Sequence, residues 1–371
     1  MISIDRGLLG KGQLGDVLER HAEYGKHVDR LDIIVFSAPG FSENKISQNV
    51  SSFPTNSKSK IRYFFDAKKL GVRLFNQNKY DLIVTQDPFV TGLVGVKLKK
   101  LFGAKLLVHF HGDFWQNPSW LRESRLNWFF WLISKWVVSK ADGIRVMSEG
   151  QKDKLVKAEV AEEKIRIIST PINFEKIEKA CRSQVADKGF KIILHVGRDD
   201  EVKDYKTLIK AYKLVKAEKS LRTVLYQAGA DKQIEIAMKN EGMNMNKDDI
   251  TLFSLAGHKD VLYLYPQADV VVLSSRSESF GKVLVEANAC GKPVVSTATT
   301  GAKEIIQDGY NGFLVPIGAA AALAEKMVYL LENPAKAKAM GENGRRLVKE
   351  KYGNNLEKII QFWQKIINSN L

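Results

Sequence analysis

The feature that most constrains this fold is the regular alternation of β-branched runs with helical patterns along almost the whole chain. Such alternation is typical of parallel sheets, because each parallel connection needs a crossover helix. The first half predicts strands at Asp32–Phe36, Asp81–Thr85, Lys105–Phe110, Gly143–Met147 and Lys164–Ile168. It predicts helices at Leu14–Gly25, Asp66–Asn78, Val90–Phe102, Arg122–Ser139 and Glu149–Glu159. The expected fold class is α/β, and the Ser-, Asn-, Gly- and Pro-containing segment 37–59 is expected to be a long loop.

A break near the middle divides the chain into two such series. Thr170-Pro171 interrupts the pattern, and a polar segment continues to Gly189. The second half then predicts strands at Lys191–Val196, Thr223–Ala228, Ile250–Leu255, Asp269–Leu273, Pro293–Ser296 and Gly312–Val315. A length of 371 residues fits two domains. We expect a domain over 1–170, a linker over 171–189, a second domain over 190–353 and a final helix over 354–371.

The most specific chemical signal lies in the second half. Glu278 and Glu286 are eight positions apart, with Phe280-Gly281 between them, and a helical run follows to Gly291. One straight helix would leave the two carboxylates about 80° apart. We therefore expect Glu278 on a loop and Glu286 in the first turn of the helix. Free amides at the helix start suit a phosphate, and the carboxylates suit sugar hydroxyls.

This segment resembles the donor-binding core of the family 4 retaining glycosyltransferases. The resemblance lies in the glutamate–seven residues–glutamate motif followed by Ala287-x-Ala-x-Gly291-x-Pro-Val-Val. Ser279 departs from the pattern, because the family usually has glycine there. The resemblance implies the GT-B architecture, in which two doubly wound Rossmann-like domains face a central cleft. It also implies that the last helix crosses back to the N-terminal domain.

The resemblance assigns further residues to the donor. Arg198 and Lys203 follow the first strand of the second domain at Gly197, with the spacing at which the family neutralises the leaving nucleoside diphosphate. Asp204 stands where the family often has glycine. The expected donor-binding residues are Gly12, Gly197, Arg198, Lys203, Glu278, Ser279, Phe280, Gly281, Lys282, Val283 and Glu286.

The first half offers weaker signals. Gly10-Lys11-Gly12-Gln-Leu-Gly15 matches the place of the family's N-terminal loop but is no strict phosphate-binding fingerprint. His109 and His111 share one side of an extended strand, as two metal ligands could, but no third or fourth ligand is nearby in sequence. By resemblance, His111 lines the reaction centre. Asp113 and Gly10 are candidates for the acceptor side.

Composition bounds the partners. The net charge is +15, and twelve Lys/Arg against three Asp lie between Lys45 and Lys105, which suits phosphorylated substrates or an anionic membrane. No nucleic-acid-binding signature is present. Cys181 and Cys290 are far apart in sequence, which predicts free thiols in a reducing, cytoplasmic setting. The sequence shows no signal-peptide-like or membrane-spanning run.

The segment 122–139 suggests contact with a membrane. Leu126, Phe129, Phe130, Ile133 and Val137 form an apolar stripe that we expect to pack on the sheet. Arg125, Trp128, Trp131 and Lys135 then lie on another side, and such a mixture suits a bilayer interface. The alternative is that the tryptophans pack on the nearby 118–120 loop or on a second copy.

The expected function is a metal-independent, hexosyltransferase-like retaining glycosyltransferase of polysaccharide biosynthesis, with a nucleotide-sugar donor and a glycan or lipid-linked acceptor. His111, Glu278, Arg198 and Lys203 are its expected catalytic residues. No cofactor is expected, and the chain lacks the Asp-x-Asp of metal-dependent transferases. The alternatives are a catalytically silent subunit that regulates a partner transferase, or a GT-B sugar-nucleotide epimerase. The donor base (uridine, guanosine or adenosine) stays open.

Overall fold

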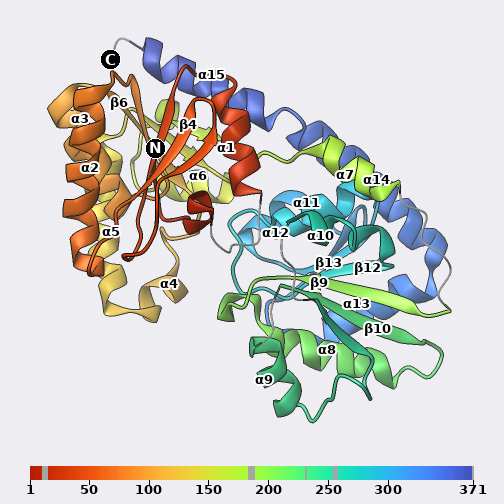
Figure 1. The fold of residues 1–371 in the computed structure, drawn as a ribbon. Coiled ribbons are helices and arrows are strands. Elements are labelled where there is room, and N and C mark those ends of the chain that lie inside the picture. The colour runs from red at the N-terminus through yellow and green to blue at the C-terminus, as the bar shows by residue number, and fades with distance from the viewer. Residues whose placement is uncertain (11–15, 183–188, 230–231, 254–257, 370–371) are drawn as a thin grey trace. The chain divides into compact units, whose positions relative to one another are not determined.

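The computed structural model describes residues 1–10, 16–182, 189–229, 232–253 and 258–369. The chain divides into a first domain, made of Met1–Ser169 and Asn355–Leu371, and a second domain, Thr170–Asn354. Each domain holds one sheet with helices on its two faces (Figure 1). Among the described residues, no helix is both long and apolar enough to cross a membrane.

The first domain contains an eight-stranded sheet with the order β3-β4-β2-β1-β5-β6-β7-β8. All its pairings are parallel except β3 with β4. The strands are β1 (Ile2–Ser3), β2 (Leu31–Val35), β3 (Asn44–Ser47), β4 (Val50–Pro54), β5 (Leu82–Thr85), β6 (Lys105–Phe110), β7 (Gly143–Val146) and β8 (Ile165–Ile167). The helices are η1 (Arg6–Leu9), α1 (Val17–Gly25), η2 (Lys60–Arg62), α2 (Tyr63–Gln77), α3 (Val90–Phe102), α4 (Pro118–Glu123), α5 (Arg125–Lys140), α6 (Glu149–Val156), η3 (Glu162–Lys164) and α15 (Asn355–Asn368).

The second domain contains a parallel six-stranded sheet with the order β11-β10-β9-β12-β13-β14. The strands are β9 (Lys191–Val196), β10 (Thr223–Ala228), β11 (Ile250–Phe253), β12 (Val270–Leu273), β13 (Val294–Thr297) and β14 (Gly312–Val315). The helices are α7 (Phe174–Cys181), η4 (Glu201–Lys203), α8 (Tyr205–Ala217), α9 (Lys232–Asn240), α10 (His258–Leu262), η5 (Tyr265–Gln267), α11 (Lys282–Ala289), α12 (Thr300–Ile305), α13 (Ala320–Glu332) and α14 (Pro334–Tyr352).

Most predicted elements of the first half are present, and the exceptions have physical reasons. Segment 37–59 was expected to be a loop, but it contains the antiparallel hairpin β3–β4, whose second strand pairs with β2. Serines on these strands hid the pattern. One of them, Ser52, is buried because its hydroxyl donates to the carbonyl of Leu8 at 2.7 Å. The central strand β1 is only two residues long and was also missed.

The domain boundaries differ from the expected ones at the linker. Segment 171–189 was expected to connect the domains, but within it α7 belongs to the second domain and contacts α10 and α11. The final helix α15 packs on the first sheet, as expected. Its buried face contributes Ile359, Phe362 and Trp363 to a core cluster that also contains Val84 and Leu107.

Helix α5 is rotated relative to the expected orientation. Leu126 and Phe129 were expected to face the sheet, but both are exposed. The buried positions are Ser134, Val137 and Val138. Ser134 is held by Trp115, whose indole N–H donates to its hydroxyl at 2.7 Å. The expected stripe therefore holds only in its second half, because Ile133 and Val137 pack on the core of the domain whereas Leu126 and Phe129 do not.

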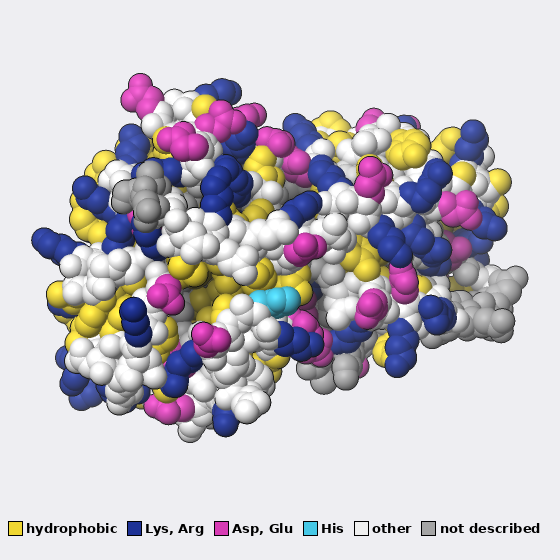
Figure 2. Space-filling model, turned by 90° about the horizontal axis from the view of Figure 1, so that it is seen from above, with side chains coloured by type: hydrophobic (Ala, Val, Ile, Leu, Met, Phe, Trp, Pro, Cys, Tyr) yellow, Lys and Arg dark blue, Asp and Glu magenta, His cyan; other side chains and the backbone are white. Residues whose placement is uncertain are grey.

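Positive charge is spread over the surface. Figure 2 shows Lys and Arg side chains scattered across the face that it displays, with Asp and Glu side chains among them. The net charge of +15 is therefore not gathered into a single stripe on that face.

Candidate active site

The candidate donor residues follow two adjacent strands at the point where the strand order of the second sheet reverses. Strand β9 pairs with β10 on one side and β12 on the other. The connections from these strands leave in opposite directions, so their carboxyl ends form the crevice in which doubly wound sheets bind ligands. Gly197 to Lys203 follow β9, and Ser274 to Gly281 follow β12. The fold thus brings together motifs that lie some 75 residues apart, as the pairing of Lys203 with Glu278 shows.

The segment after β9 presents one exposed cation and one partly buried cation. Arg198 is exposed, and its carbonyl accepts a hydrogen bond of 2.7 Å from the Tyr205 hydroxyl. Lys203 ends the short helix η4, which Asp200 caps through the amide of Val202 at 3.0 Å. Gly197 leaves little room for a side chain, because an added Cβ would lie 2.9 Å from the Tyr205 hydroxyl oxygen and 3.0 Å from Cε1 of the buried His195.

Asp204 explains one departure from the family pattern. Its backbone is left-handed, with φ 47° and ψ 57°, a conformation that glycine adopts without strain. The aspartate is stabilised there by its carboxylate, which accepts from the Thr207 hydroxyl at 2.8 Å and forms an ion pair with Arg276 at 3.2 Å. A polar side chain therefore compensates locally for the glycine that the family often has.

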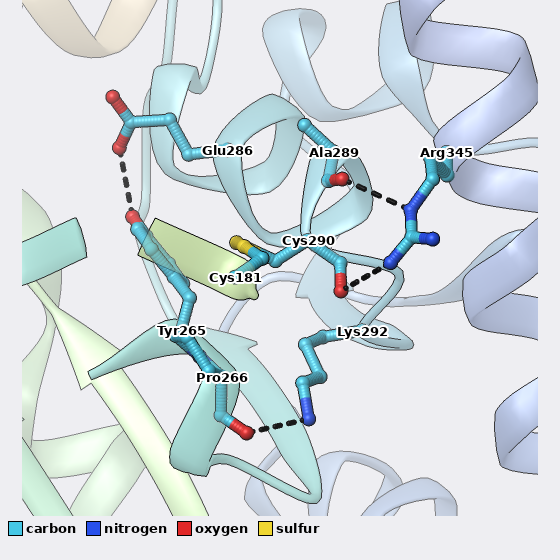
Figure 3. Close-up of a disulfide and its surroundings, with 8 residues drawn as sticks. All are labelled: Cys181, Tyr265, Pro266, Glu286, Ala289, Cys290, Lys292 and Arg345. Atoms are coloured by element: carbon cyan, nitrogen blue, oxygen red, sulfur yellow. Dashed lines mark hydrogen bonds between the residues drawn. A yellow bond between two sulfur atoms is a disulfide. The ribbon is translucent and has the colours of Figure 1, made fainter. Parts of the chain in front are cut away.

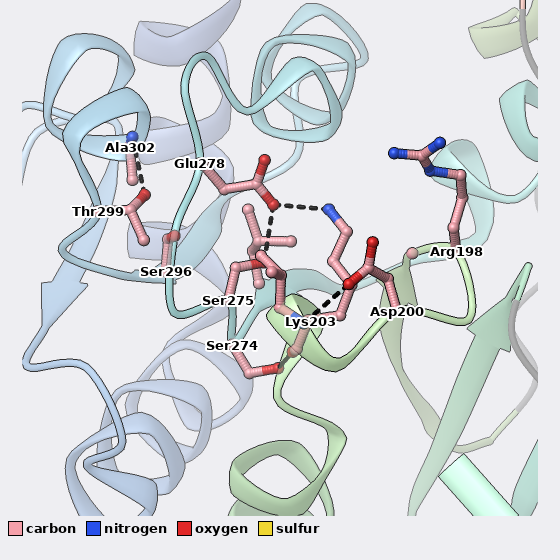
Figure 4. Close-up of polar contacts among 12 residues, drawn as sticks. Arg198, Asp200, Lys203, Ser274, Ser275, Glu278, Ser296, Thr299 and Ala302 are labelled. Carbon is pink, nitrogen blue, oxygen red and sulfur yellow. Dashed lines mark hydrogen bonds and ion pairs between the residues drawn. The ribbon is translucent and has the colours of Figure 1, made fainter. Parts of the chain in front are cut away.

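Lys203 and Glu278 form the centre of the site. The ammonium of Lys203 lies 2.6 Å from Oε1 of Glu278, and the same oxygen accepts from the Ser275 hydroxyl at 2.7 Å (Figure 4). Both charged side chains are 16% exposed, so a ligand can contact the ion pair although little of it is in contact with solvent. The Ser274 hydroxyl donates to the Lys203 carbonyl at 2.7 Å and ties the two segments together.

The loop that carries Glu278 is held in place by a hydrogen bond from α12. Gly301 donates its amide to the carbonyl of Glu278 at 2.8 Å. An added Cβ on Gly301 would lie 2.6 Å from backbone atoms of Phe280, so only glycine permits this approach. The Phe280 ring is buried against Tyr352. Gly301 and Ser275 were not among the predicted site residues. For Gly301, the position shortly after strand β13 is a sequence feature that could have identified it.

Glycine is also needed where α11 begins. Gly281 has φ 85° and stands before the first helical residue, with no side chain capping the helix. Ser279, Lys282 and Val283 are half-buried around this start. The placement of Glu278 on the loop is confirmed.

Glu286 lies deeper than expected. It is the fifth residue of α11, so it stands in the second helical turn and not in the first. Its side chain is 3% exposed. One carboxylate oxygen accepts from the Tyr265 hydroxyl at 2.8 Å, and the other lies 3.1 Å from the ammonium of Lys282. Burial and the nearby Glu286 carboxylate raise the pKa of Tyr265, so this hydroxyl keeps its proton and remains a donor.

A disulfide lies one turn beyond Glu286. Cys290, which caps α11, is bonded to Cys181 at the end of α7, with Cα atoms 5.6 Å apart (Figure 3). The expectation of two free thiols was therefore wrong. The two cysteines are separated by 109 residues, and only the packing of α7 on α11 brings them together.

Arg345 holds the same end of α11. Its guanidinium donates to the carbonyls of Ala289 at 3.2 Å and Cys290 at 3.1 Å (Figure 3). A cation at the carboxyl end of a helix satisfies its unpaired carbonyls and its dipole. The helix that carries Glu286 is thus fixed at its far end by a covalent bond and by the guanidinium of Arg345.

A buried histidine supports the segment after β9. His195 is fully buried, and its Nδ1 lies 2.6 Å from Oε1 of Gln227. Burial lowers the pKa of His195 to about 3, so the ring is neutral at physiological pH and donates through Nδ1. The Gln227 amide in turn donates to the Ala228 carbonyl at 3.0 Å. Sequence reasoning did not single out either residue.

The candidate residues of the first domain lie beyond strand ends. His111 follows β6 and is exposed, with its ring 5.4 Å from that of the buried His109. The Asp113 carboxylate, 8% exposed, lies 2.6 Å from the Lys154 ammonium. Gly10 has φ 74° and ends η1, whereas Gly12 lies outside the described residues. Among the described residues, no three His, Cys, Asp or Glu side chains could hold a metal together.

Comparison with known families agrees with this layout. Residues 176–347 match the profile of the glycosyl transferases group 1, and residues 20–176 match that of the glycosyltransferase family 4. An uncharacterized glycosyltransferase of Methanocaldococcus jannaschii is 25% identical over 94% of both chains. The capsular polysaccharide biosynthesis glycosyltransferase CapM of Staphylococcus aureus is 25% identical, covering 88% of this chain and 87% of CapM.

Solved structures show the same fold over nearly the whole chain. A sucrose-phosphate synthase from Thermosynechococcus elongatus superposes with a TM-score of 0.80 at 22% identity, covering 98% of both chains. Anabaena HepE, solved in complex with UDP-glucose, superposes with a TM-score of 0.75 at 19% identity, covering 98% of this chain and 99% of HepE. The two profile matches are adjacent and together run from residue 20 to 347. The chain therefore belongs to the glycosyl transferases group 1 and has the GT-B fold.

Proposed function

We propose that this protein is a retaining glycosyltransferase that moves a sugar from a nucleotide-sugar donor to a hydroxyl of a glycan or lipid-linked acceptor. The observation that carries the proposal is the meeting of Lys203 and Glu278 at 2.6 Å where the strand order reverses. A cation and a carboxylate placed beside the start of α11 offer one group for a phosphate and one for sugar hydroxyls.

The donor side follows from the chemistry of these residues. Arg198 and Lys203 neutralise the diphosphate, Arg198 as a planar fork and Lys203 as a point charge. Glu278 exchanges its contact with Lys203 for sugar hydroxyls, and the amides from Ser279 to Val283 bind phosphate oxygens. Glu286 accepts from the ribose hydroxyls, with its carboxylate oriented by Tyr265 at 2.8 Å. HepE was solved with UDP-glucose, which favours a uridine donor here.

The proposed reaction needs no base from the protein. The bond between the anomeric carbon and the leaving phosphate oxygen breaks, and the acceptor oxygen bonds that carbon on the same face. The acceptor's proton passes to the leaving phosphate oxygen. Arg198, Lys203 and the helix amides stabilise the charge that develops on the diphosphate, a role that metal ions fill in other transferases. In this proposal His111 acts on the transferred sugar, Gly12 belongs with the donor-binding residues, and Gly10 and Asp113 serve the acceptor.

The acceptor is proposed to be a growing polysaccharide or its lipid-linked precursor at the inner face of the cell membrane. The similarity to CapM, a capsular polysaccharide biosynthesis glycosyltransferase, supports the glycan class.

The test is a donor screen with the purified chain. Calorimetry should find that one of uridine, guanosine or adenosine diphosphate binds, and the matching nucleotide sugars should then be assayed for transfer. Proton NMR of the product should show the anomeric configuration of the donor. An inverted product would refute retention, an epimerised donor would favour the epimerase alternative, and loss of activity with chelator restored by a divalent ion would refute metal independence.

A further inference from the structure

Helix α5 is apolar on two faces, and only one of them packs on the domain. Its inner face buries Ser134, Val137 and Val138. Its outer face carries five large apolar side chains with exposed fractions of 63, 55, 59, 58 and 42%: Leu126, Trp128, Phe129, Leu132 and Trp136. These five residues are called the outer face of α5 below. A contiguous apolar surface of this kind marks an interaction site in a water-soluble domain.

The exposure does not result from a loosely attached helix. Ser124 caps α5 by accepting from the amide of Leu126 at 3.2 Å. The indole N–H of Trp115 reaches Ser134 on the opposite side at 2.7 Å. The helix is thus fixed in rotation with its outer face outward, and positions 126 to 136 extend over about 15 Å.

The outer face is bordered by positive charge. Segment 118–140 contains four basic residues, Arg122, Arg125, Lys135 and Lys140, and one acidic residue, Glu123. All five are exposed. The ammonium of Lys135 lies 3.9 Å from the centre of the Trp131 ring, so part of the charge is held against the aromatic surface.

A second apolar group lies at the same edge of the first domain. Helix α2 begins with Phe65 exposed in its first turn, after Ile61, which is 82% exposed in η2. Segment 58–69 carries Lys58, Lys60, Arg62, Lys68 and Lys69 against Asp66 alone. Helices α2 and α5 both contact α3. Both begin after the carboxyl ends of parallel strands, so their starts lie at the sheet edge where His111 follows β6.

We infer that the outer face of α5, together with the start of α2, docks on an anionic lipid bilayer. Aromatic and aliphatic side chains insert at headgroup level, and the surrounding Lys and Arg meet lipid phosphates. A second copy of this chain fits less well, because a twofold interface would place the same cationic border against itself. The inference deepens the proposed function, since it brings His111 to the surface that holds a lipid-linked acceptor.

The experiment is co-sedimentation of the full chain with vesicles. Vesicles of phosphatidylglycerol and phosphatidylcholine should carry the protein into the pellet, and binding should weaken as salt is raised from 50 to 500 mM. Vesicles of phosphatidylcholine alone should leave it in the supernatant. Equal recovery in the supernatant with both vesicle types would overturn the inference.

Matched variants locate the surface. Trp128→Ser with Phe129→Ser should lower the partition coefficient by at least about tenfold, as expected when two large apolar side chains no longer insert. The control is Ile236→Ser with Tyr263→Ser, two side chains of the second domain that are 54% and 55% exposed. The control pair should bind vesicles like the wild type. Unchanged binding of the Trp128/Phe129 variant, or equal loss in both variants, would overturn the assignment.

Two further readouts separate this inference from the proposed reaction. Calorimetry with uridine, guanosine and adenosine diphosphates should give the same affinity in wild type and in the Trp128/Phe129 variant. A failure to bind any of these diphosphates would thus contradict the proposed function but would not contradict the inferred membrane contact. Sedimentation velocity should show a monomer at vesicle-assay concentrations. A dimer that dissociates in the Trp128/Phe129 variant would instead assign the outer face of α5 to a second copy.

Discussion

Each domain holds a lysine–carboxylate ion pair beyond the end of a strand. The nitrogen–oxygen distance is the same in both pairs, but their surroundings differ. Lys203 and Glu278 are 2.6 Å apart in the second domain, and both side chains are 16% exposed. Lys154 and Asp113 are also 2.6 Å apart in the first domain, where the lysine is 23% and the aspartate 8% exposed. The first pair joins two loops from adjacent strands at the strand-order reversal. The second joins the segment after β6 to α6.

This difference indicates that the second domain, and not the first, is arranged to bind a small, charged ligand. In the second domain, hydroxyls of Ser274 and Ser275, the amide of Gly301 and the start of α11 all surround one ion pair. In the first domain, the Asp113 carboxylate faces mostly protein. We therefore expect substitutions in the second domain to weaken donor binding, and substitutions in the first domain to change donor binding only slightly.

The largest effect is expected from Lys203→Ala. It removes the cation that stabilises the departing diphosphate and leaves the Glu278 carboxylate with the Ser275 hydroxyl but no cationic partner. Turnover should fall by about 10² to 10³, and donor affinity should fall as well. Steady-state kinetics with the donor found by screening measures both, with Lys206→Ala as a nearby control. Wild-type turnover in Lys203→Ala would remove this ion pair from the reaction.

The next largest effect concerns the disulfide. Closing a loop of 109 residues restricts the unfolded chain, and typical disulfides contribute about 2–4 kcal/mol. Cys181→Ser should lower the free energy of unfolding of the second domain by this amount in denaturant titrations. The same variant reduced with dithiothreitol should show no further change, whereas the reduced wild type should match it. Two free thiols in the unreduced, denatured wild type would show that the bond does not form in solution.

A smaller effect is expected from Glu286→Gln. The amide still accepts from Tyr265 through one oxygen, so the fold should be retained, but one acceptor for ribose is lost. Nucleoside diphosphate affinity should fall by about tenfold, the value of one hydrogen bond to a charged group. Calorimetry with the diphosphate alone measures it. Unchanged affinity would reduce Glu286 to a structural partner of Tyr265.

The smallest effect is expected from Asp113→Asn in the first domain. Because this carboxylate is paired with Lys154, its substitution should leave diphosphate affinity within about twofold of the wild type, as for most changes away from a binding site. The same calorimetry applies. A large loss of donor affinity would break the contrast between the two ion pairs and place Asp113 on the donor.

Periodicity was sufficient for much of the fold. Strands β6, β9, β10 and β14 and helix α3 have the predicted bounds, because each is rich in apolar residues with a clear periodicity. The failures lie where tertiary pairing supplied what the local sequence lacked. Strand β1 is two residues long, and the hairpin β3–β4 is polar. Both are strands because neighbouring strands provide their hydrogen bonds.

Within the candidate site, the motif correctly placed Glu278 on a loop and Lys203 after the first strand of the domain. It missed Ser275, which holds Glu278, and the buried His195 of the strand before Lys203. Ser275 has no sequence signature, and His195 has the pattern of an ordinary strand residue. Their roles arise from neighbours that are distant in sequence: Glu278 is held by Gly301, and His195 by Gln227.

By itself, the sequence determined the α/β class, the division into two domains and the donor motif, because these depend on local periodicity, on breaks and on the spacing of a few chemical groups. Only the tertiary structure decided that Lys203 meets Glu278, that Cys181 reaches Cys290 and that Leu126 and Phe129 face outward. The physical reason is that each of these depends on contacts between elements. A helix has two sides that can be apolar, and only the partners packed against it decide which one is buried.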